Sequence, residues 1–251
     1  MITYEYPLNE RIRILMRMED LFAKYAHFMA RDTALDHHAA LLALFEILEV
    51  ARGDLKSDLI QELERQRHTL ELLRNNPSVK SDALEEVLAN IVTTVSQLQK
   101  LSGKTGQHLR DNEWVMSIKQ RACIPGGVCE FDLPSFHYWL SLDIAARRDN
   151  LQEWMAPFQP LHSAICIILK ILRDSGQSTH RVATKGAYQQ MLSGRPAQML
   201  RVKLAQDLPY FPEISANKYA INIRFTALGV GIERPKICDA NVEFDLTLCC
   251  L

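Results

Sequence analysis

The segment YAINIRF, residues 219–225, alternates apolar and polar side chains with a period of two, and VEFDLTL, residues 242–248, repeats the pattern. Such alternation is typical of antiparallel strands that place one face on a core and the other in water. A third alternating segment covers residues 199–204, and joining segments of about ten residues rich in Gly, Pro, Ser and Asn favour a meander of hairpins. The last third of the chain is therefore predicted to form an antiparallel sheet.

The first 121 residues instead show the period of about 3.6 residues that is typical of amphipathic helices. Asn9 is placed as an N-cap, and Asp82 with Glu85 matches a capping box. Because the loops between the helical segments are short, we expect an antiparallel bundle. The expected helices cover residues 9–30, 36–52, 57–74, 82–102 and 106–121, with two more over 134–142 and 160–174.

Between the helices and the sheet lies RACIPGGVCEFDLPSFHYWL, residues 121–140, which combines a Pro-Gly-Gly turn with an aromatic helix. We expect two short strands around the turn, over residues 123–133. A phosphate-binding loop is disfavoured, because such a loop leads directly into a helix N-terminus, whereas strand-like residues follow these glycines.

The predicted fold class is α+β, with helices first and sheet later. Residues 1–121 are expected to form a helical domain, and the helices around 134–175 are expected to pack on it. Residues 122–251 are expected to form a smaller β domain, built from strands near 123–133 and 178–250.

Composition argues against several classes of protein. Lys and Arg total 29 and Asp and Glu total 30, so the net charge of −1 provides no global attraction to nucleic acid or to an anionic membrane. The N-terminal residues become charged early and lack the apolar core of a secretory signal. Apolar runs such as 165–169 are far shorter than the roughly 20 residues that span a bilayer. We therefore expect a cytoplasmic protein without membrane insertion.

Cysteine and histidine spacing predicts neither a metal site nor a cofactor site. Only the adjacent pairs Cys249-Cys250 and His37-His38 approach the short spacing that zinc ligands usually have. Without an export signal, the six cysteines are expected to be reduced, buried thiols. They are Cys123, Cys129, Cys166, Cys238, Cys249 and Cys250.

Catalytic residues are not evident either. A nucleophilic pair of Cys129 and His137 would need an orienting carboxylate such as Asp132, and nothing in their spacing demands that role. Cys129 and Phe131 are instead expected in the core, and His137 at a packing or interface position. Paired carboxylates such as Glu85-Glu86 fit solvated helix faces. We therefore predict a protein that is not an enzyme.

A local excess of positive charge is the most informative feature. Residues 195–236 contain seven basic and three acidic residues. Alternation places Lys218, Asn222 and Arg224 opposite the apolar side of their strand, and Arg201 and Lys203 alternate in the same way. The face is either simply solvated or an anchor for an acidic peptide or a phosphate backbone.

Several blocks spread through the chain resemble one family. They are YPLNERIR (6–13), GQHLR (106–110), IPGGVCEFDLP (124–134) followed by HYWL (137–140), and NIRF (222–225). This combination resembles the Z-ring-associated protein D family, ZapD. The resemblance implies a cytoplasmic division factor recruited to mid-cell, with a helical and a β domain. It also implies a symmetric homodimer that binds the C-terminal tail of FtsZ and crosslinks its filaments.

The resemblance also implies which residues make contact. Arg17, Arg110 and His137 would serve the helical side or assist bundling, while Lys218 and Arg224 would meet the FtsZ tail on the sheet. The full set of binding or bundling candidates is Arg17, Arg52, Arg110, His137, Lys218, Arg224, Arg201 and Lys203.

Two other functions remain open at this stage. A nucleic-acid-binding module could use the same basic sheet face, although few aromatic residues lie between its basic residues to stack on bases. A hydrolase or transferase could use Cys129 and His137. Both compete with the adaptor function that the resemblance implies.

Overall fold

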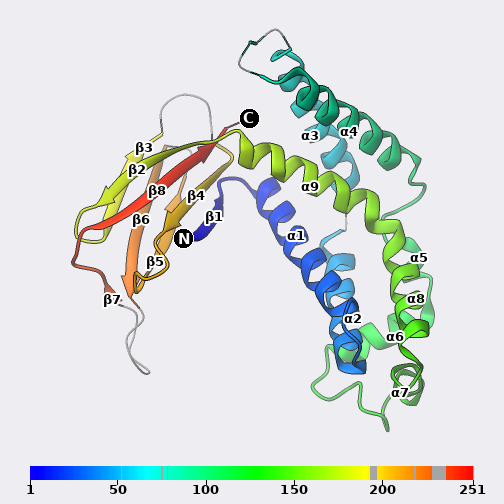
Figure 1. Cartoon of the computed structure of the whole chain (residues 1–251). Coiled ribbons are helices and arrows are strands. Elements are labelled where there is room, and N and C mark those ends of the chain that lie inside the picture. The colour runs from blue at the N-terminus through cyan, green and yellow to red at the C-terminus, as the bar shows by residue number, and fades with distance from the viewer. Residues whose placement is uncertain are drawn as a thin grey trace. The chain divides into compact units, whose positions relative to one another are not determined.

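The computed structural model describes residues 1–51, 53–74, 76–77, 79–192, 197–217, 219–227 and 236–250. The chain divides into two compact units, one of Met1–Met16 with Leu169–Leu251 and the other of Arg17–Ile168. The division differs from the boundary expected after residue 121. Its physical reason is that strand β1 (Ile2–Pro7) pairs with a strand from the far end of the chain, so both ends build the same unit (Figure 1).

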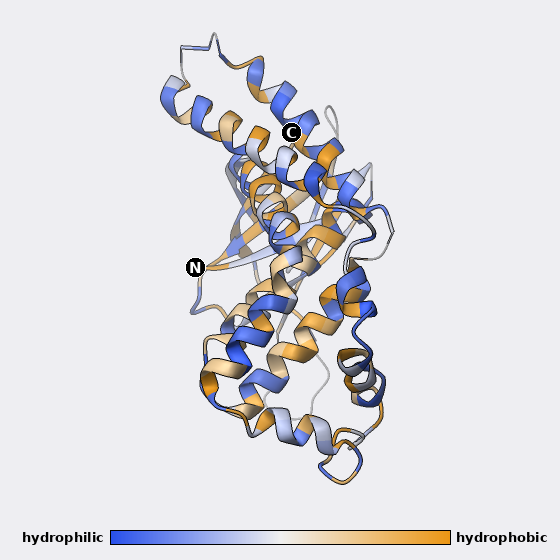
Figure 2. Ribbon diagram, turned by 90° about the vertical axis from the view of Figure 1, so that its right-hand side faces the viewer, coloured by the Kyte–Doolittle hydropathy of each residue, from blue (hydrophilic) through white to orange (hydrophobic). Residues whose placement is uncertain are grey.

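The helical unit contains most of the helices, and Figure 2 shows polar and apolar residues in alternating patches along them, as expected of amphipathic helices. α3 packs against α4, while α2 packs against α6, α7 and α8. The helices are α1 (Glu10–Met29), α2 (Ala34–Val50), α3 (Leu55–Glu71), α4 (Ser81–Lys100), α5 (Gln107–Arg110), α6 (Glu113–Ala122), α7 (Pro134–Leu140), α8 (Ile144–Met155), the 3₁₀ turn η1 (Ala156–Phe158) and α9 (Gln159–Asp174).

Side-chain caps determine several helix boundaries. Asn9 Oδ1 accepts the amide of Ile12 at 2.9 Å, as predicted. α2 begins earlier than Asp36, because Thr33 Oγ1 accepts the amide of Asp36 at 3.1 Å. The helix expected over residues 106–121 is two helices, because Asn112 accepts the amide of Val115 at 3.0 Å and starts α6 anew.

The two strands expected over residues 123–133 are a wrong prediction. The segment forms successive turns, in which Gly127 donates to the carbonyl of Ile124 at 2.9 Å and Cys129 to that of Gly126 at 3.1 Å. These local hydrogen bonds occupy the backbone groups that a strand ladder would need. Cys129 and Phe131 are exposed, Phe131 by 79%, so their predicted place in the core is also wrong.

The β unit contains two antiparallel sheets rather than the expected meander. One has the order β1-β4-β8-β2, and the other has the order β3-β6-β5 with β7 beside β6. Most neighbours in these sheets are distant in sequence, so local hairpin signals could not reveal the order. The strands after β1 are β2 (Gln177–Ala183), β3 (Ala187–Met191), β4 (Met199–Leu204), β5 (Tyr210–Ala216), β6 (Ala220–Ala227), β7 (Lys236–Ile237) and β8 (Val242–Cys249).

The apolar faces of the two sheets share one core. β4 has the predicted bounds, and β6 and β8 match the other two alternating segments closely. Their inward side chains pack together with Ala183 and Cys238, which is the arrangement of a β-sandwich. The main contributors are Leu200, Val202 and Leu204 from β4, Ile221, Ile223 and Phe225 from β6, and Val242, Phe244 and Leu246 from β8. The predicted α+β fold class is therefore confirmed.

One helical stretch among the described residues, Ile144–Asp174, is long and apolar enough by length and composition to cross a membrane. The stretch is longer than any uninterrupted apolar run of the sequence, because η1 joins α8 to α9. Half of its apolar window is buried in the protein, and Leu161, Ile165 and Ile168 are fully buried. Burial of this extent is what a core helix of a folded protein shows.

A buried arginine holds together several loops of the helical unit. Arg147 donates to the carbonyls of Asp32 and Leu140, each at 3.0 Å, and to that of Leu142. Its Nε donates at 2.9 Å to Nδ1 of His37, whose Nε2 lies 2.8 Å from the carbonyl of Arg31. Because Nδ1 accepts, the proton of the neutral ring lies on Nε2, which donates to that carbonyl.

Acid is expected to destabilise the helical unit. Burial lowers the pKa values of His37, His38 and His162 below their ordinary value of 6.5. The unfolded chain therefore takes up protons first, so the stabilisation is complete above pH 6.5 and is lost as pH falls below it. Urea unfolding followed by tryptophan fluorescence should give a smaller free energy at about pH 5.5 than at about pH 7.5.

A variant tests the assignment of this acid sensitivity. His38 packs edge-on against Phe136, with 5.2 Å between the ring centroids. His38→Leu removes one of the titrating groups from this apolar contact. The free energy of unfolding should therefore fall less between about pH 7.5 and about pH 5.5 in the variant than in the wild type. An identical loss in the wild type and in the variant would contradict a contribution from His38.

Candidate functional site

The central strand β6 directs alternate side chains to opposite sides of its sheet. Ile221 and Ile223 are fully buried in the sandwich core, whereas Asn222 and Arg224 are exposed on the outer face. This arrangement is the one that the alternation in NIRF predicts. Sequence alone therefore identified the exposed positions of this strand correctly.

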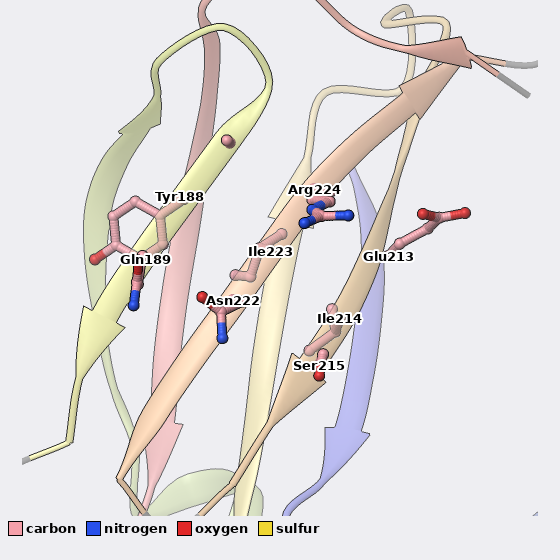
Figure 3. A pocket seen from close by; sticks show the side chains of 9 residues that line it. Tyr188, Gln189, Glu213, Ile214, Ser215, Asn222, Ile223 and Arg224 are labelled. Carbon is pink, nitrogen blue, oxygen red and sulfur yellow. The ribbon is translucent and has the colours of Figure 1, made fainter.

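A shallow groove of about 650 Å³ runs over this outer face (Figure 3). The register places Arg224 between Ala187 of β3 and Glu213 of β5, and places Asn222 between Gln189 and Ser215 in the next outward row. The lining residues are Ala187, Tyr188, Gln189, Glu213, Ile214, Ser215, Asn222, Ile223 and Arg224.

Arg224 offers an available positive charge in the groove. Within the part of the chain that the structure describes, its guanidinium forms none of the ion pairs. Glu213 is its cross-strand neighbour, but Figure 3 shows the carboxylate of Glu213 directed away from Arg224. An incoming carboxylate could therefore bind Arg224 without first displacing an internal partner.

Arg201 and Lys203 do not extend this groove, because they belong to β4 in the other sheet of the sandwich. Arg201 Nε lies 3.0 Å from Oε1 of Glu5, a carboxylate that also binds Arg173 at 2.7 Å. Lys203 is in register with Asp245 of β8. The basic residues that alternate along the sequence are thus distributed over two sheets, and those of β4 lie beside carboxylates.

The helical candidates differ in availability. Arg17 is exposed on α1, and His137 is exposed on α7 with its Nε2 3.7 Å from a carboxylate oxygen of Glu130. Arg110 is half-buried and donates to the carbonyls of Thr105 at 2.5 Å and Leu48 at 3.2 Å, so its guanidinium already supports the fold.

Four basic residues of the sequence prediction lie outside the described residues. Two of them, Arg52 and Lys218, are binding candidates. The other two, Arg195 and Arg234, belong to the positive excess of residues 195–236.

Arg110 also lines a second cavity, of about 600 Å³, in the helical unit. Lys56 and Lys104 line it too, and Lys56 Nζ donates to the carbonyl of Leu101 at 2.6 Å. Neither Arg17 nor His137 lines this cavity. The helical candidates are therefore not gathered in a single cavity.

The thiols differ from the prediction that all six are buried. Cys123 and Cys129 are exposed, because the central block forms turns rather than the strands that were expected to bury them. Cys238 and Cys249 are buried, and burial raises the pKa of the Cys249 thiol to about 11. Within the described ranges, no group of three His, Cys, Asp or Glu side chains could hold a metal ion.

Sequence reasoning missed the flanks of the groove. Gln189 lies on β3 and both Glu213 and Ser215 lie on β5, two strands that were not predicted. β5 carries Pro212, which weakens a strand pattern and is typical of an edge strand. The alternation of Glu213 and Ser215 with Ile214 is the signal that could have revealed this strand.

Comparison with known proteins gives a consistent result. The family model ZapD, described as a cell division protein, matches residues 16–224. The chain is 55% identical over 250 residues to Cell division protein ZapD of Dechloromonas aromatica (strain RCB), covering 99% of each chain. It is 52% identical over 252 residues to the protein of the same name from Azoarcus sp. (strain BH72), covering 100% of each. It is 53% identical over 251 residues to that of Aromatoleum aromaticum, covering 100% of this chain and 98% of the relative.

These matches extend over the helical unit and the β unit alike, including the groove residues from β3, β5 and β6. The resemblance noted in the sequence blocks is thereby confirmed over the full length. The chain belongs to the ZapD family of cell division proteins.

Proposed function

We propose that this protein binds the C-terminal tail of FtsZ and crosslinks FtsZ filaments, and that Arg224 is the centre of the tail-binding site on the β unit. The observation that carries the proposal is an exposed arginine in a groove of about 650 Å³, without an ion pair among the described residues. A guanidinium binds a carboxylate through charge-assisted hydrogen bonds, which are roughly twice as strong as neutral ones.

Crosslinking requires two binding sites in one particle. We propose that the protein acts as a symmetric homodimer, because twofold symmetry duplicates each groove. Two weak contacts to neighbouring filaments then act together through a high effective concentration. Exposed Arg17 and His137 are proposed to assist bundling from the helical unit.

The proposed role involves no chemical turnover. Cys129 lies at a turn and His137 on α7, both exposed, and the carboxylate near the histidine is Glu130, at 3.7 Å, rather than Asp132. An exposed pair provides no environment that excludes water from a reaction. We therefore propose a binding protein that works in the cytoplasm at the division site.

Co-sedimentation with polymerised FtsZ tests tail binding. The protein should pellet with filaments of full-length FtsZ and remain in the supernatant with filaments of FtsZ that lacks its C-terminal tail. Equal pelleting with both kinds of filament would contradict the proposed recognition of the tail.

A matched pair of variants tests the position of the site. Arg224→Gln should weaken binding roughly tenfold or more, because it removes a charge-assisted hydrogen bond of about 1.5–3 kcal/mol. Lys203→Gln removes the same charge from the other sheet and should leave the affinity nearly unchanged. Fluorescence anisotropy with a labelled FtsZ tail peptide provides the measurement. A larger loss for Lys203→Gln than for Arg224→Gln would move the site to the β4 face.

A further inference from the structure

β3 forms one edge of the sheet that carries the groove. The strand order is β3-β6-β5, so β6 borders β3 on one side, and no described strand borders it on the other. The amide of Phe225 donates to the carbonyl of Gly186 at 2.7 Å, and the amide of Leu192 donates to that of Tyr219 at 2.6 Å. Because hydrogen-bonded residues alternate in an antiparallel pair, the even-numbered residues of β3 are those that bond to β6.

The odd-numbered residues of β3 direct their backbone groups to the free edge. The amide of Ala187 donates there to the carbonyl of Thr184 at 3.0 Å, within the tight turn that leads into β3. The amides and carbonyls of Gln189 and Met191 face no described strand. Both residues are exposed, so the edge offers their N–H donors and C=O acceptors to an incoming strand.

The opposite edge of the same sheet is blocked. The amide of Asn217 donates to the carbonyl of Ala220 at 3.0 Å, so the odd-numbered residues of β5 bond to β6 and the even-numbered ones face outward. Pro212 is one of the outward residues, and it has no N–H to donate. Natural sheets protect their edges with proline or lysine, and β3, with the sequence AYQQM, has neither. β3 is therefore the edge that can accept a strand.

The side chains along β3 suit an acidic and partly apolar peptide. Ala187 is in register with Arg224 and Gln189 with Asn222, so these side chains share the outer face of the sheet (Figure 3). A strand added to β3 would lie about 9.5 Å from β6, which is twice the spacing of strands. Extended arginine and glutamate side chains together span this distance, and the small Ala187 leaves the route between them open. Met191, on the same face at the other end of β3, is 66% exposed and offers an apolar contact.

We propose that the β unit binds its ligand by strand addition. An extended peptide pairs with the free edge of β3, a carboxylate of the peptide binds Arg224 across Ala187, and an apolar side chain four positions along the peptide packs on Met191. The inference rests on the proposed function, and it names the form in which the FtsZ tail would bind. In strand addition, main-chain hydrogen bonds supply affinity and alternate side chains supply specificity. A separation of four positions places both side chains on one face of the added strand.

Amide hydrogen exchange of the full-length wild type tests the added strand directly. Saturating FtsZ tail peptide should slow exchange at the amides of Gln189 and Met191 roughly tenfold or more, because each gains a hydrogen bond. The amides of Ile214 and Ala216, which face the outer edge of β5, should keep their rates. Unchanged rates on β3, or equal slowing on both edges, would overturn the inference. So would protection of the β3 edge that is present without peptide and rises with protein concentration, because it would assign the edge to a second copy of the chain.

Backbone methylation of the peptide supplies a second test, with all side chains kept. Labelled FtsZ tail peptides, each N-methylated at one successive position, are compared by fluorescence anisotropy. Methyl groups at alternate positions should weaken binding roughly fivefold or more, because they remove an N–H that points at β3, whereas the intervening positions should tolerate methylation. Effects that do not alternate would show that the peptide lies on the sheet face without pairing, and would overturn the inference.

Two designed peptides test the side-chain spacing without FtsZ. Both are Thr- and Ser-rich and carry one Glu and one Leu, separated by four positions in one peptide and by three in the other. An odd separation turns the Leu to the opposite face, so the four-position peptide should bind roughly threefold or more tightly. Met191→Ser should remove this difference. Equal affinities of the two peptides for the wild type would contradict the proposed contacts.

A matched pair of proline variants tests the edge from the protein side. Gln189→Pro removes an outward N–H from β3, and Ala216→Pro removes one from β5, while both leave the hydrogen bonds to β6 in place. Gln189→Pro should weaken tail binding roughly fivefold or more, and Ala216→Pro should not. Equal affinities of the two variants would contradict pairing at β3. The methylated peptides use the wild-type protein and therefore decide the question where a proline variant fails to fold.

The same probes separate strand addition from the proposed function. Tail binding that neither protects the β3 edge nor alternates under methylation would overturn strand addition alone. Binding of the four-position peptide with protection of the β3 edge, but no binding of the tail, would overturn the proposed partner alone. Failure of the wild type to bind any of these peptides would overturn both.

Discussion

Replacing Arg147 by methionine is expected to lower the free energy of unfolding of the helical unit by about 3–5 kcal/mol. Arg147 is only 6% exposed, and it donates to the carbonyls of Asp32, Leu140 and Leu142. Methionine has similar length but no donor, so these acceptors lose their partner in a place that water reaches poorly. His37 also loses the hydrogen bond to its Nδ1.

Tryptophan fluorescence during urea unfolding measures this loss selectively. The three tryptophans, Trp114, Trp139 and Trp154, all lie in the helical unit, and their rings pack together with centroids 5.8–6.3 Å apart. Their emission therefore reports the unfolding of this unit rather than of the β unit.

The neighbouring Arg148 supplies the control for this measurement. It donates to the carbonyls of Met29, Ala30 and Arg31, but its side chain is 32% exposed. Water can replace its hydrogen bonds, so Arg148→Met should cost less, about 1–2 kcal/mol. Equal losses for the two variants would contradict burial as the reason for the large effect.

Replacing Gly186 by alanine is expected to destabilise the β unit by about 2–4 kcal/mol. Gly186 has a φ of +68°, a backbone conformation that residues with a side chain rarely adopt. A Cβ at this position would also collide with the backbone carbonyl of Cys238. Its amide donates to the carbonyl of Ala240 at 2.8 Å, and its carbonyl accepts the amide of Phe225 at 2.7 Å. Any displacement that relieves the collision therefore disturbs β6, the central strand of the groove.

Gly103→Ala is the control for the steric part of this effect. Gly103 has a similar φ of +74°, but a Cβ there meets nothing within 4 Å. Only the conformational penalty of about 1–2 kcal/mol applies. Gly103 lies in the helical unit, so tryptophan fluorescence during urea unfolding measures the loss in Gly103→Ala. Tyrosine near-UV circular dichroism measures the loss in Gly186→Ala, because five of the seven tyrosines, Tyr4, Tyr6, Tyr188, Tyr210 and Tyr219, lie in the β unit. A loss for Gly186→Ala no greater than that for Gly103→Ala would contradict the collision.

Sequence reasoning succeeded where the signal is local. β4 was predicted with its observed bounds, and Asn9 caps α1 as expected. Period-two alternation and capping involve residues within a few positions of one another, so no long-range contact is needed to recognise them. The same reasoning failed at residues 123–133, where turn hydrogen bonds of the Pro-Gly-Gly block prevail over the local strand pattern.

By itself, the sequence determined the α+β class, the family resemblance and the outward position of Arg224, because each depends on neighbouring residues or on motifs. Only the tertiary structure decided which positive charges are available. Arg201 lies beside Glu5, a residue nearly two hundred positions away, because β1 pairs with β4. Arg224 lies on β6, between β3 and β5. Among the described residues, no carboxylate forms an ion pair with it. Strand order is a non-local property set by the packing of a shared core, and a local pattern therefore cannot specify it.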